Sequence, residues 1–215
     1  MTTDHAYDKD DREAVYRVIA ERRDMRHFAG GAVDESVLAR LLAAAHQAPS
    51  VGLMQPWRIV RVTDGELRQA LHDHVELERR RTAEAMGERA EEFMRLKVQG
   101  ILDCAEVLVV ALGDDRERHV FGRRTMPHMD LASVSCAIQN LWLAARAEGL
   151  GMGWVSLFVP DEVAALISAP DGAEPVAILC LGPVDAFYPR PMLEQESWTT
   201  VRPLDELLAH NVWPT

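Results

Sequence analysis

Three arginines within five residues, Arg22, Arg23 and Arg26, form the first cluster that could do chemistry. Guanidinium groups bind phosphate oxygens through a planar fork, so the cluster predicts recognition of a phosphorylated small molecule. A solvated charge cluster at a helix end would have the same spacing. Arg22 favours phosphate recognition, because it continues the stripe of Val15 and Val18 that should face the protein interior.

Asp24 lies inside this cluster and is a candidate catalytic carboxylate. The neighbouring guanidiniums favour its ionised form, which can accept a proton but donates one poorly. Its simpler role would be structural, as the ion-pair partner of Arg23 or Arg26. The sequence leaves both roles open.

Two loops could also contact a ligand. Residues 48–57, APSVGLMQPW, form a rigid, non-helical connection in which Ser50 and Gln55 offer hydrogen bonds. In residues 151–158, GMGWVSLF, the glycines would let the backbone approach a ligand closely. The alternatives are an ordinary turn in the first loop, and a helix stop before a core strand in the second.

A fourth candidate is Arg190, which two prolines hold in a rigid direction. An exposed arginine on a tail is the alternative. The histidines and the three cysteines show no metal-ligand spacing, so we expect no metal site.

Helices and strands must position these residues. Apolar periodicity predicts helices after Asp11, at 35–48, 66–100 and 130–148, and after Pro160. Apolar runs predict strands at 58–62, 106–112, 153–158 and 176–182, and 113–129 reads as a polar loop. Two helices carry long buried stripes: Val37, Leu38, Leu41, Leu42 and Ala45, and Val134, Ile138, Leu141, Trp142 and Ala145. A sheet flanked by helices is the natural packing.

Composition narrows the function. The 215 residues are 48% hydrophobic and carry a net charge of −11, which disfavours nucleic acid as a partner. This net charge does not exclude a local basic pocket for a phosphorylated small molecule. The polar start and the absence of a long apolar run predict neither a signal peptide nor a membrane span. Cys104, Cys136 and Cys180 are expected to be free, buried thiols, which suits a cytoplasmic protein.

Four stretches of the sequence resemble the 5,6-dimethylbenzimidazole synthase (flavin destructase) family of nitroreductase-like flavoproteins. They are RRDMR, APSVGLMQPW, QNLWLAARAEGLGMGWVSLF and LGPVDAFYPRPMLE. The resemblance runs from about residue 12 to the C-terminus. It implies an α+β fold with a mostly antiparallel sheet flanked by helices. It also implies a single domain over residues 1–215 with an arm from about 183, and an intertwined homodimer that binds FMN at its interface.

The resemblance also implies roles for residues. Arg22, Arg23 and Arg26 would hold the FMN phosphate and ribityl chain, and Arg190 would add a phosphate contact. Met25 stands where the family typically has valine, within the same FMN-binding stretch. Ser50 and Gln55 would lie near the flavin, with Ser50 reached from the same chain or across the dimer. Val155, Ser156 and Leu157 would line the flavin ring, with Asp24 and Ser156 as catalytic residues and residues 79–100 as a lid. The stretch 27–33 is one residue shorter than in typical members.

The implied reaction uses reduced FMN as a substrate and O2 as a co-substrate. It yields 5,6-dimethylbenzimidazole, the lower ligand of cobalamin, and erythrose 4-phosphate, and a separate flavin reductase would supply the reduced FMN. Two alternatives stay open. One is an FMN-dependent NAD(P)H nitroreductase or dehalogenase relative, and the other is a flavin-storage or flavin-sensing protein without turnover.

Overall fold

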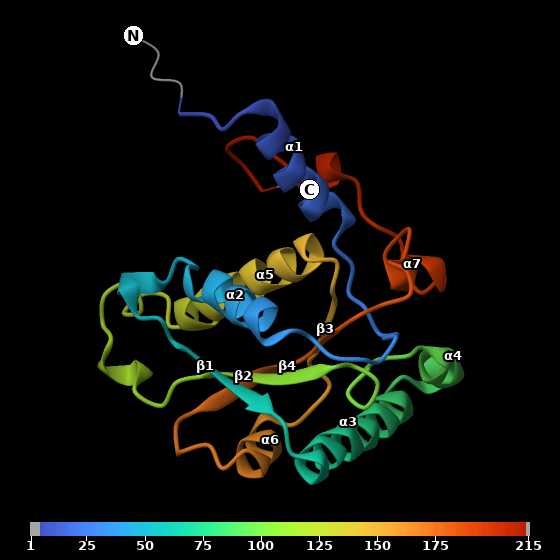
Figure 1. The fold of residues 1–215 in the computed structure, drawn as a ribbon. Helices are drawn as coiled ribbons and strands as arrows, with labels where there is room; N and C mark the ends of the chain where they lie inside the picture. The colour runs from blue at the N-terminus through green and yellow to red at the C-terminus, as the bar shows by residue number, and fades with distance from the viewer. Residues whose placement is uncertain (1–4, 214–215) are drawn as a thin grey trace.

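A four-stranded antiparallel sheet forms the centre of the structure, a computed structural model that describes residues 5–213 (Figure 1). The strands, in the order β1-β2-β4-β3, are β1 (Trp57–Val62), β2 (Glu106–Leu112), β4 (Glu174–Gly182) and β3 (Gly151–Val155). Every residue of β2 is buried, because helices cover both faces of the sheet. The predicted α+β fold with an antiparallel sheet is therefore confirmed.

Two helical layers enclose the sheet (Figure 1). Helices α2 (Glu35–His46) and α5 (Met129–Ala147) cover one face, where Leu108 and Val110 of β2 join their apolar stripes. Helices α3 (Gly65–Ala85) and α6 (Pro160–Leu166) cover the other face, against Val107 and Val109. Alternate residues of one strand thus feed two separate cores.

Local signals explain most element boundaries. The carboxylate of Asp34 caps α2 by accepting a hydrogen bond from the Ser36 N–H at 2.7 Å, and Asp64 caps α3 through the Leu67 N–H at 2.7 Å. The predicted stripe of α5 is buried as expected, and α2 buries Leu38, Leu41 and Ala45, with Val37 and Leu42 partly buried.

The single helix expected over residues 66–100 is wrong. Helix α3 ends at Ala85, and Gly87, with φ at 58°, starts the short turn η2 (Gly87–Arg89) before α4 (Ala90–Arg95). A left-handed backbone suits glycine and interrupts the helix. The chain after α4 is irregular as far as β2, apart from a turn, so the lid segment, residues 79–100, is a bent structure and not a rod.

Helix α1 (Lys9–Glu21) differs from the prediction in its burial. The expected buried stripe is uncovered: α1 has no buried residue, and Val15 and Ile19 are 57% and 49% exposed. The helix stands away from the sheet layers and contacts α5 (Figure 1). Most of its apolar face therefore has no cover among the residues that the structure describes.

The remaining differences are smaller. Strand β3 ends at Val155, so Ser156 and Leu157 lie in the loop that follows it. Cys136 lies exposed on α5, whereas Cys104 and Cys180 are buried free thiols as expected. The 113–129 loop contains the short helix η3 (Arg116–Arg118) and further turns before α5 begins at Met129, and β1 is preceded by η1 (Val51–Leu53).

The arm, residues 183–213, contains α7 (Met192–Gln195) and η4 (Leu204–Glu206) and is otherwise irregular. The ends of the single domain expected over 1–215, residues 1–4 and 214–215, lie outside the described residues. No helix within residues 5–213 is long and apolar enough to cross a membrane.

Candidate functional site

The arginine turn, residues 22–26, passes from the end of α1 to the edge of the sheet. Helix α1 ends at Glu21, and Arg22 leaves it with φ −58° and ψ 135°. The chain then runs beside β3, where the Met25 N–H donates to the Met152 carbonyl at 2.9 Å and Asp24 forms a parallel bridge with Met152. The turn therefore extends the sheet beyond β3 by one short contact.

Gly153 of β3 makes this contact possible, and Gly151 likewise admits Val184 at the start of the arm. A Cβ atom on Gly153 would lie 2.2 Å from the Met25 carbonyl oxygen, and one on Gly151 would lie 2.4 Å from Val184. These distances are far inside van der Waals contact. The close approach that the sequence assigned to a ligand is therefore made by the chain itself, which corrects that prediction.

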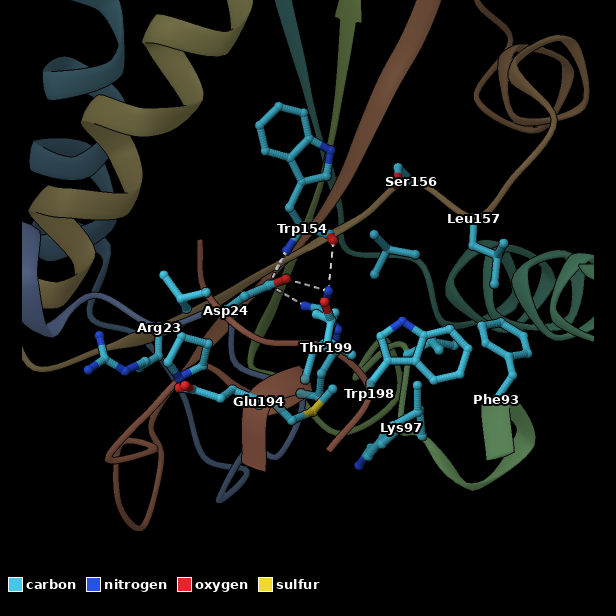
Figure 2. Close-up of a pocket in the computed structure, with 18 of the residues that line it drawn as sticks. Arg23, Asp24, Phe93, Lys97, Trp154, Ser156, Leu157, Glu194, Trp198 and Thr199 are labelled. Carbon is cyan, nitrogen blue, oxygen red and sulfur yellow. Dashed lines mark hydrogen bonds and ion pairs between the residues drawn. The ribbon is translucent and has the colours of Figure 1, made fainter. Parts of the chain in front are cut away.

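Asp24 and Arg26 form the central ion pair of the site (Figure 2). Arg26 binds both carboxylate oxygens of Asp24, with Nη2 at 2.6 Å from Oδ2, and also donates to the Trp154 carbonyl at 3.0 Å. The Trp154 N–H in turn donates to Oδ1 of Asp24 at 3.0 Å. Asp24 is thus held from two sides, yet its side chain is 43% exposed and faces the cavity described below.

Arg22 and Arg23 are arranged differently. Arg23 donates to the carbonyls of Ala20 and Arg22, both at 2.7 Å, and to Pro189 at 3.2 Å, so most of its fork binds the backbone. Its buried Nε has no hydrogen-bond partner among the described residues. Arg22 stacks on Trp142 with Cζ 4.6 Å from the ring centre. Of the three predicted phosphate ligands, Arg22 therefore keeps the most hydrogen-bonding capacity for a ligand.

These groups line one wall of a cavity of about 510 Å³. Val155, Ser156 and Leu157 extend this wall beyond Trp154 (Figure 2). The lid segment supplies an opposite wall with Met86, Phe93, Leu96, Lys97 and Val98, and the arm supplies the rest with residues 191–194 and 198–201. The volume is in the range of sites that bind drug-sized or cofactor-sized molecules.

The base of the lid segment is tied to α3. Arg79 donates to the carbonyls of Met94 at 2.6 Å and Leu96 at 2.8 Å, and to Glu76 at 3.2 Å. Burial raises the pKa of Glu76, but hydrogen bonds from Gln99 and Arg79 outweigh burial and lower it below its ordinary value. The lower part of the lid is therefore held by an ionised network.

Four predicted site residues lie outside the cavity lining. Met25 is 1% exposed and packs in the interior beneath the turn. Arg190 is exposed beside the lining residue Pro191. Ser50 and Gln55 belong to the segment before β1, which lies at the opposite end of the molecule from α4 and α7 (Figure 1), and the Ser50 hydroxyl accepts the Gln55 N–H at 3.0 Å. Neither residue lines the cavity that Asp24 faces.

The sequence did not single out several lining residues. Phe93, Lys97, Glu194 and Trp198 come from the lid segment and the arm, where no periodic pattern marks one face. Trp154 stood inside a recognised stretch, but only its backbone contacts reveal its role in holding Asp24. A tryptophan in a mostly exposed arm was the one available signal for Trp198.

Comparison with known proteins assigns the class. A profile of the nitroreductase family matches residues 19–183, and the chain belongs to this family. The crystal structure of an oxidised iodotyrosine deiodinase bound to FMN and 3-iodo-L-tyrosine superposes with a TM-score of 0.66 at 25% identity, covering 82% of this chain and 94% of that one.

Within the family, two curated relatives are more similar. A 5,6-dimethylbenzimidazole synthase of Rhodospirillum rubrum is 40% identical over 205 residues, covering 94% of this chain and 97% of the relative. A second such synthase, from Rhodobacter capsulatus, is 38% identical over 194 residues, covering 89% and 94%. The chain therefore belongs among the 5,6-dimethylbenzimidazole synthases of the nitroreductase family.

Proposed function

We propose that this protein fragments reduced FMN in the presence of O2 to 5,6-dimethylbenzimidazole and erythrose 4-phosphate, and so supplies the lower ligand of cobalamin. The observation that carries this proposal is the similarity to two synthases over about nine tenths of the chain or more. The site supports it with a carboxylate, Asp24, held open to an FMN-sized cavity.

The residues present fit FMN. Phe93, Leu157 and Trp198 offer apolar and aromatic surface for a ring system, and Arg22 offers a guanidinium for the phosphate. Met25 would support FMN binding indirectly, by packing beneath the arginine turn. Arg190, next to the lining residue Pro191, would add a contact to the FMN phosphate.

Reduced FMN supplies the electrons and the ring carbons of the product. The protein's part is to hold the flavin, exclude water and move protons. Arg26 and the Trp154 N–H hold the Asp24 carboxylate in place at the cavity wall, so Asp24 is suited to accept a proton from the ribityl chain. Ser156 lines the same wall, and its hydroxyl would orient the reacting group.

A homodimer completes the proposed site. The apolar face of α1 and the arm residues Leu204 and Trp213, which are 74% and 88% exposed, need cover that the described residues 5–213 do not supply. Ser50 and Gln55 do not line the cavity of their own chain. In the proposed dimer, Ser50 and Gln55 of one protomer reach the flavin bound by its partner. Val155 and Leu157 of the protomer that binds the flavin line the flavin ring.

The proposal includes a separate flavin reductase, because reduced FMN is consumed and must be replaced. It places the enzyme in the cytoplasm, where the free thiols of Cys104 and Cys180 stay reduced. No particular observation favours the NAD(P)H-dependent reductase or the storage protein over the synthase.

The decisive experiment is chromatography of the products after the protein is incubated with pre-reduced FMN and air. Formation of 5,6-dimethylbenzimidazole supports the synthase. Reoxidation to intact FMN with turnover of NAD(P)H would instead support a reductase, and tight binding with neither outcome would support storage.

Asp24→Asn tests the catalytic carboxylate within this proposal. The substitution keeps the shape and removes the basic oxygen, so the variant should bind reduced FMN and consume O2 but form little product. Loss of FMN affinity in proportion to activity would assign Asp24 a structural role as partner of Arg26. Near-normal product formation would remove Asp24 from the mechanism.

A further inference from the structure

Trp198 joins the arm to the tip of the lid segment. The guanidinium of Arg89, in η2, stacks on the Trp198 ring with Cζ 3.6 Å from the ring centre, and its Nη2 donates to the Trp198 carbonyl at 3.3 Å. The ring of Phe93, in α4, lies 6.2 Å from the Trp198 ring, and both pack in one apolar cluster with Leu157 (Figure 2). One side chain of the arm thus contacts both short helices of the lid.

The arm holds Trp198 in a defined position. Its N–H donates to the Leu193 carbonyl at 2.8 Å as the chain leaves α7, and Ser197 before it adopts a left-handed backbone with φ at 57°. Such a conformation is uncommon outside glycine and persists where the surroundings require it. Trp198 is therefore presented to the lid by a rigid turn.

The two ends of the lid depend on different contacts. Arg79, in α3, binds the carbonyls of Met94 and Leu96 and so anchors the C-terminal end of α4. The residues before it, from Gly87 to Phe93, contact the arm through the stacking of Arg89 and Phe93 with Trp198. Loss of Trp198 would leave the end of α4 anchored and free η2 and the start of α4.

We propose that Trp198 is a positioning residue that latches the lid segment over the cavity through Arg89 and Phe93, and so controls how much of the reduced flavin is fragmented. This inference rests on the proposed function. With the latch closed, water is excluded and the flavin is retained for fragmentation. With the latch open, two electrons and two protons pass from reduced FMN to O2, which gives intact FMN and hydrogen peroxide.

The first test measures the latch without flavin. Hydrogen exchange of the backbone amides in residues 86–96 is compared in the wild type, Trp198→Ala and Arg89→Ala. Loss of a partly buried cation–π contact and its hydrogen bond should speed exchange at least about fivefold in both variants. Trp198→Phe keeps an aromatic ring and should restore much of the protection.

Arg81→Ala is the matched control, since it removes an exposed arginine of the lid that pairs with Glu78 on its own helix. It should leave exchange in residues 86–96 unchanged. Unchanged exchange in both Trp198→Ala and Arg89→Ala would overturn the latch, whatever reaction the protein catalyses. Should Trp198→Ala fail to fold, Arg89→Ala alone decides, because Arg89 does not line the cavity.

The second test measures the ratio of 5,6-dimethylbenzimidazole formed to hydrogen peroxide released during aerobic incubation with reduced FMN. Both latch variants should lower this ratio, by about threefold or more, as water enters the site. A fall confined to Trp198→Ala would mean that the ring acts by direct contact with the flavin, which refutes the latch. A wild type that forms no product would refute the proposed function and leave the exchange result standing.

Discussion

Gly153→Ala is the sharpest test of how this fold builds its site. The new Cβ atom would meet the Met25 carbonyl oxygen at 2.2 Å and the Arg26 Nη1 at 2.6 Å, so the arginine turn must move away from β3. That movement breaks the bond from the Met25 N–H to Met152 and the bond from the Trp154 N–H to Asp24. The backbone carbonyl cannot swing aside as the end of a flexible side chain could.

The expected loss follows from these contacts. Overpacking costs about 1–3 kcal/mol, and each lost hydrogen bond costs about 0.5–1.5 kcal/mol, so the free energy of unfolding should fall by about 2–6 kcal/mol. With a urea slope of about 2 kcal/mol per M, the unfolding midpoint should drop by about 1 M or more. FMN affinity should fall as well, because Asp24 and Arg26 move with the turn.

Gly65→Ala is the matched control for the urea titration and for a flavin fluorescence titration. A Cβ atom on Gly65 meets no atom within 4 Å, and this residue begins α3, where alanine is the better helix former. Its midpoint should stay the same or rise slightly. If Gly153→Ala matches Gly65→Ala in both titrations, the close approach of the turn to β3 does not position the site.

Three further predictions address the ligand, the assembly and pH. Riboflavin, which lacks the phosphate, should bind much more weakly than FMN. Arg22→Ala should weaken FMN binding roughly tenfold or more and change riboflavin binding little, because a charge-assisted bond to the phosphate is lost. Equal losses of affinity for both ligands in fluorescence titrations would contradict this role of Arg22. Sedimentation at micromolar concentration should give twice 24.0 kDa, whereas a stable, flavin-binding monomer would refute the shared site. The lowered pKa of Glu76 predicts a stabilisation that is complete above its ordinary value of 4.5 and is lost as the pH falls through its lower folded value. Glu76→Gln should therefore lower the urea midpoint of unfolding at neutral pH. The difference in midpoint between the wild type and this variant should shrink near about pH 3, and a difference that stays constant with pH would exclude this linkage.

Local patterns were enough to predict most of the layers. The stripe of Val134, Ile138 and Leu141 on α5 and the continuous apolar run of β2 follow from side-chain periodicity, which depends on neighbours along the chain. Helix breaks were harder, because the turn at Gly87 interrupts a segment whose charged composition suits a helix. The exposed face of α1 was misjudged because periodicity shows that a face is apolar and does not show what covers it.

The site divides in the same way. Residue types and their order are enough to predict which groups are available: a cluster of arginines with Asp24 inside it, a Pro-Ser loop, and a glycine-rich strand, in an order that resembles one family. The folded chain was needed to show that Arg26 binds Asp24 and the Trp154 carbonyl, 128 residues away, and that the turn fills the space beside Gly153. It also placed Trp198 against Arg89 and separated Ser50 from the cavity. The physical reason is that residue types set what a group can bind, whereas its actual partner depends on which distant segments the packed sheet and helices bring within hydrogen-bonding distance.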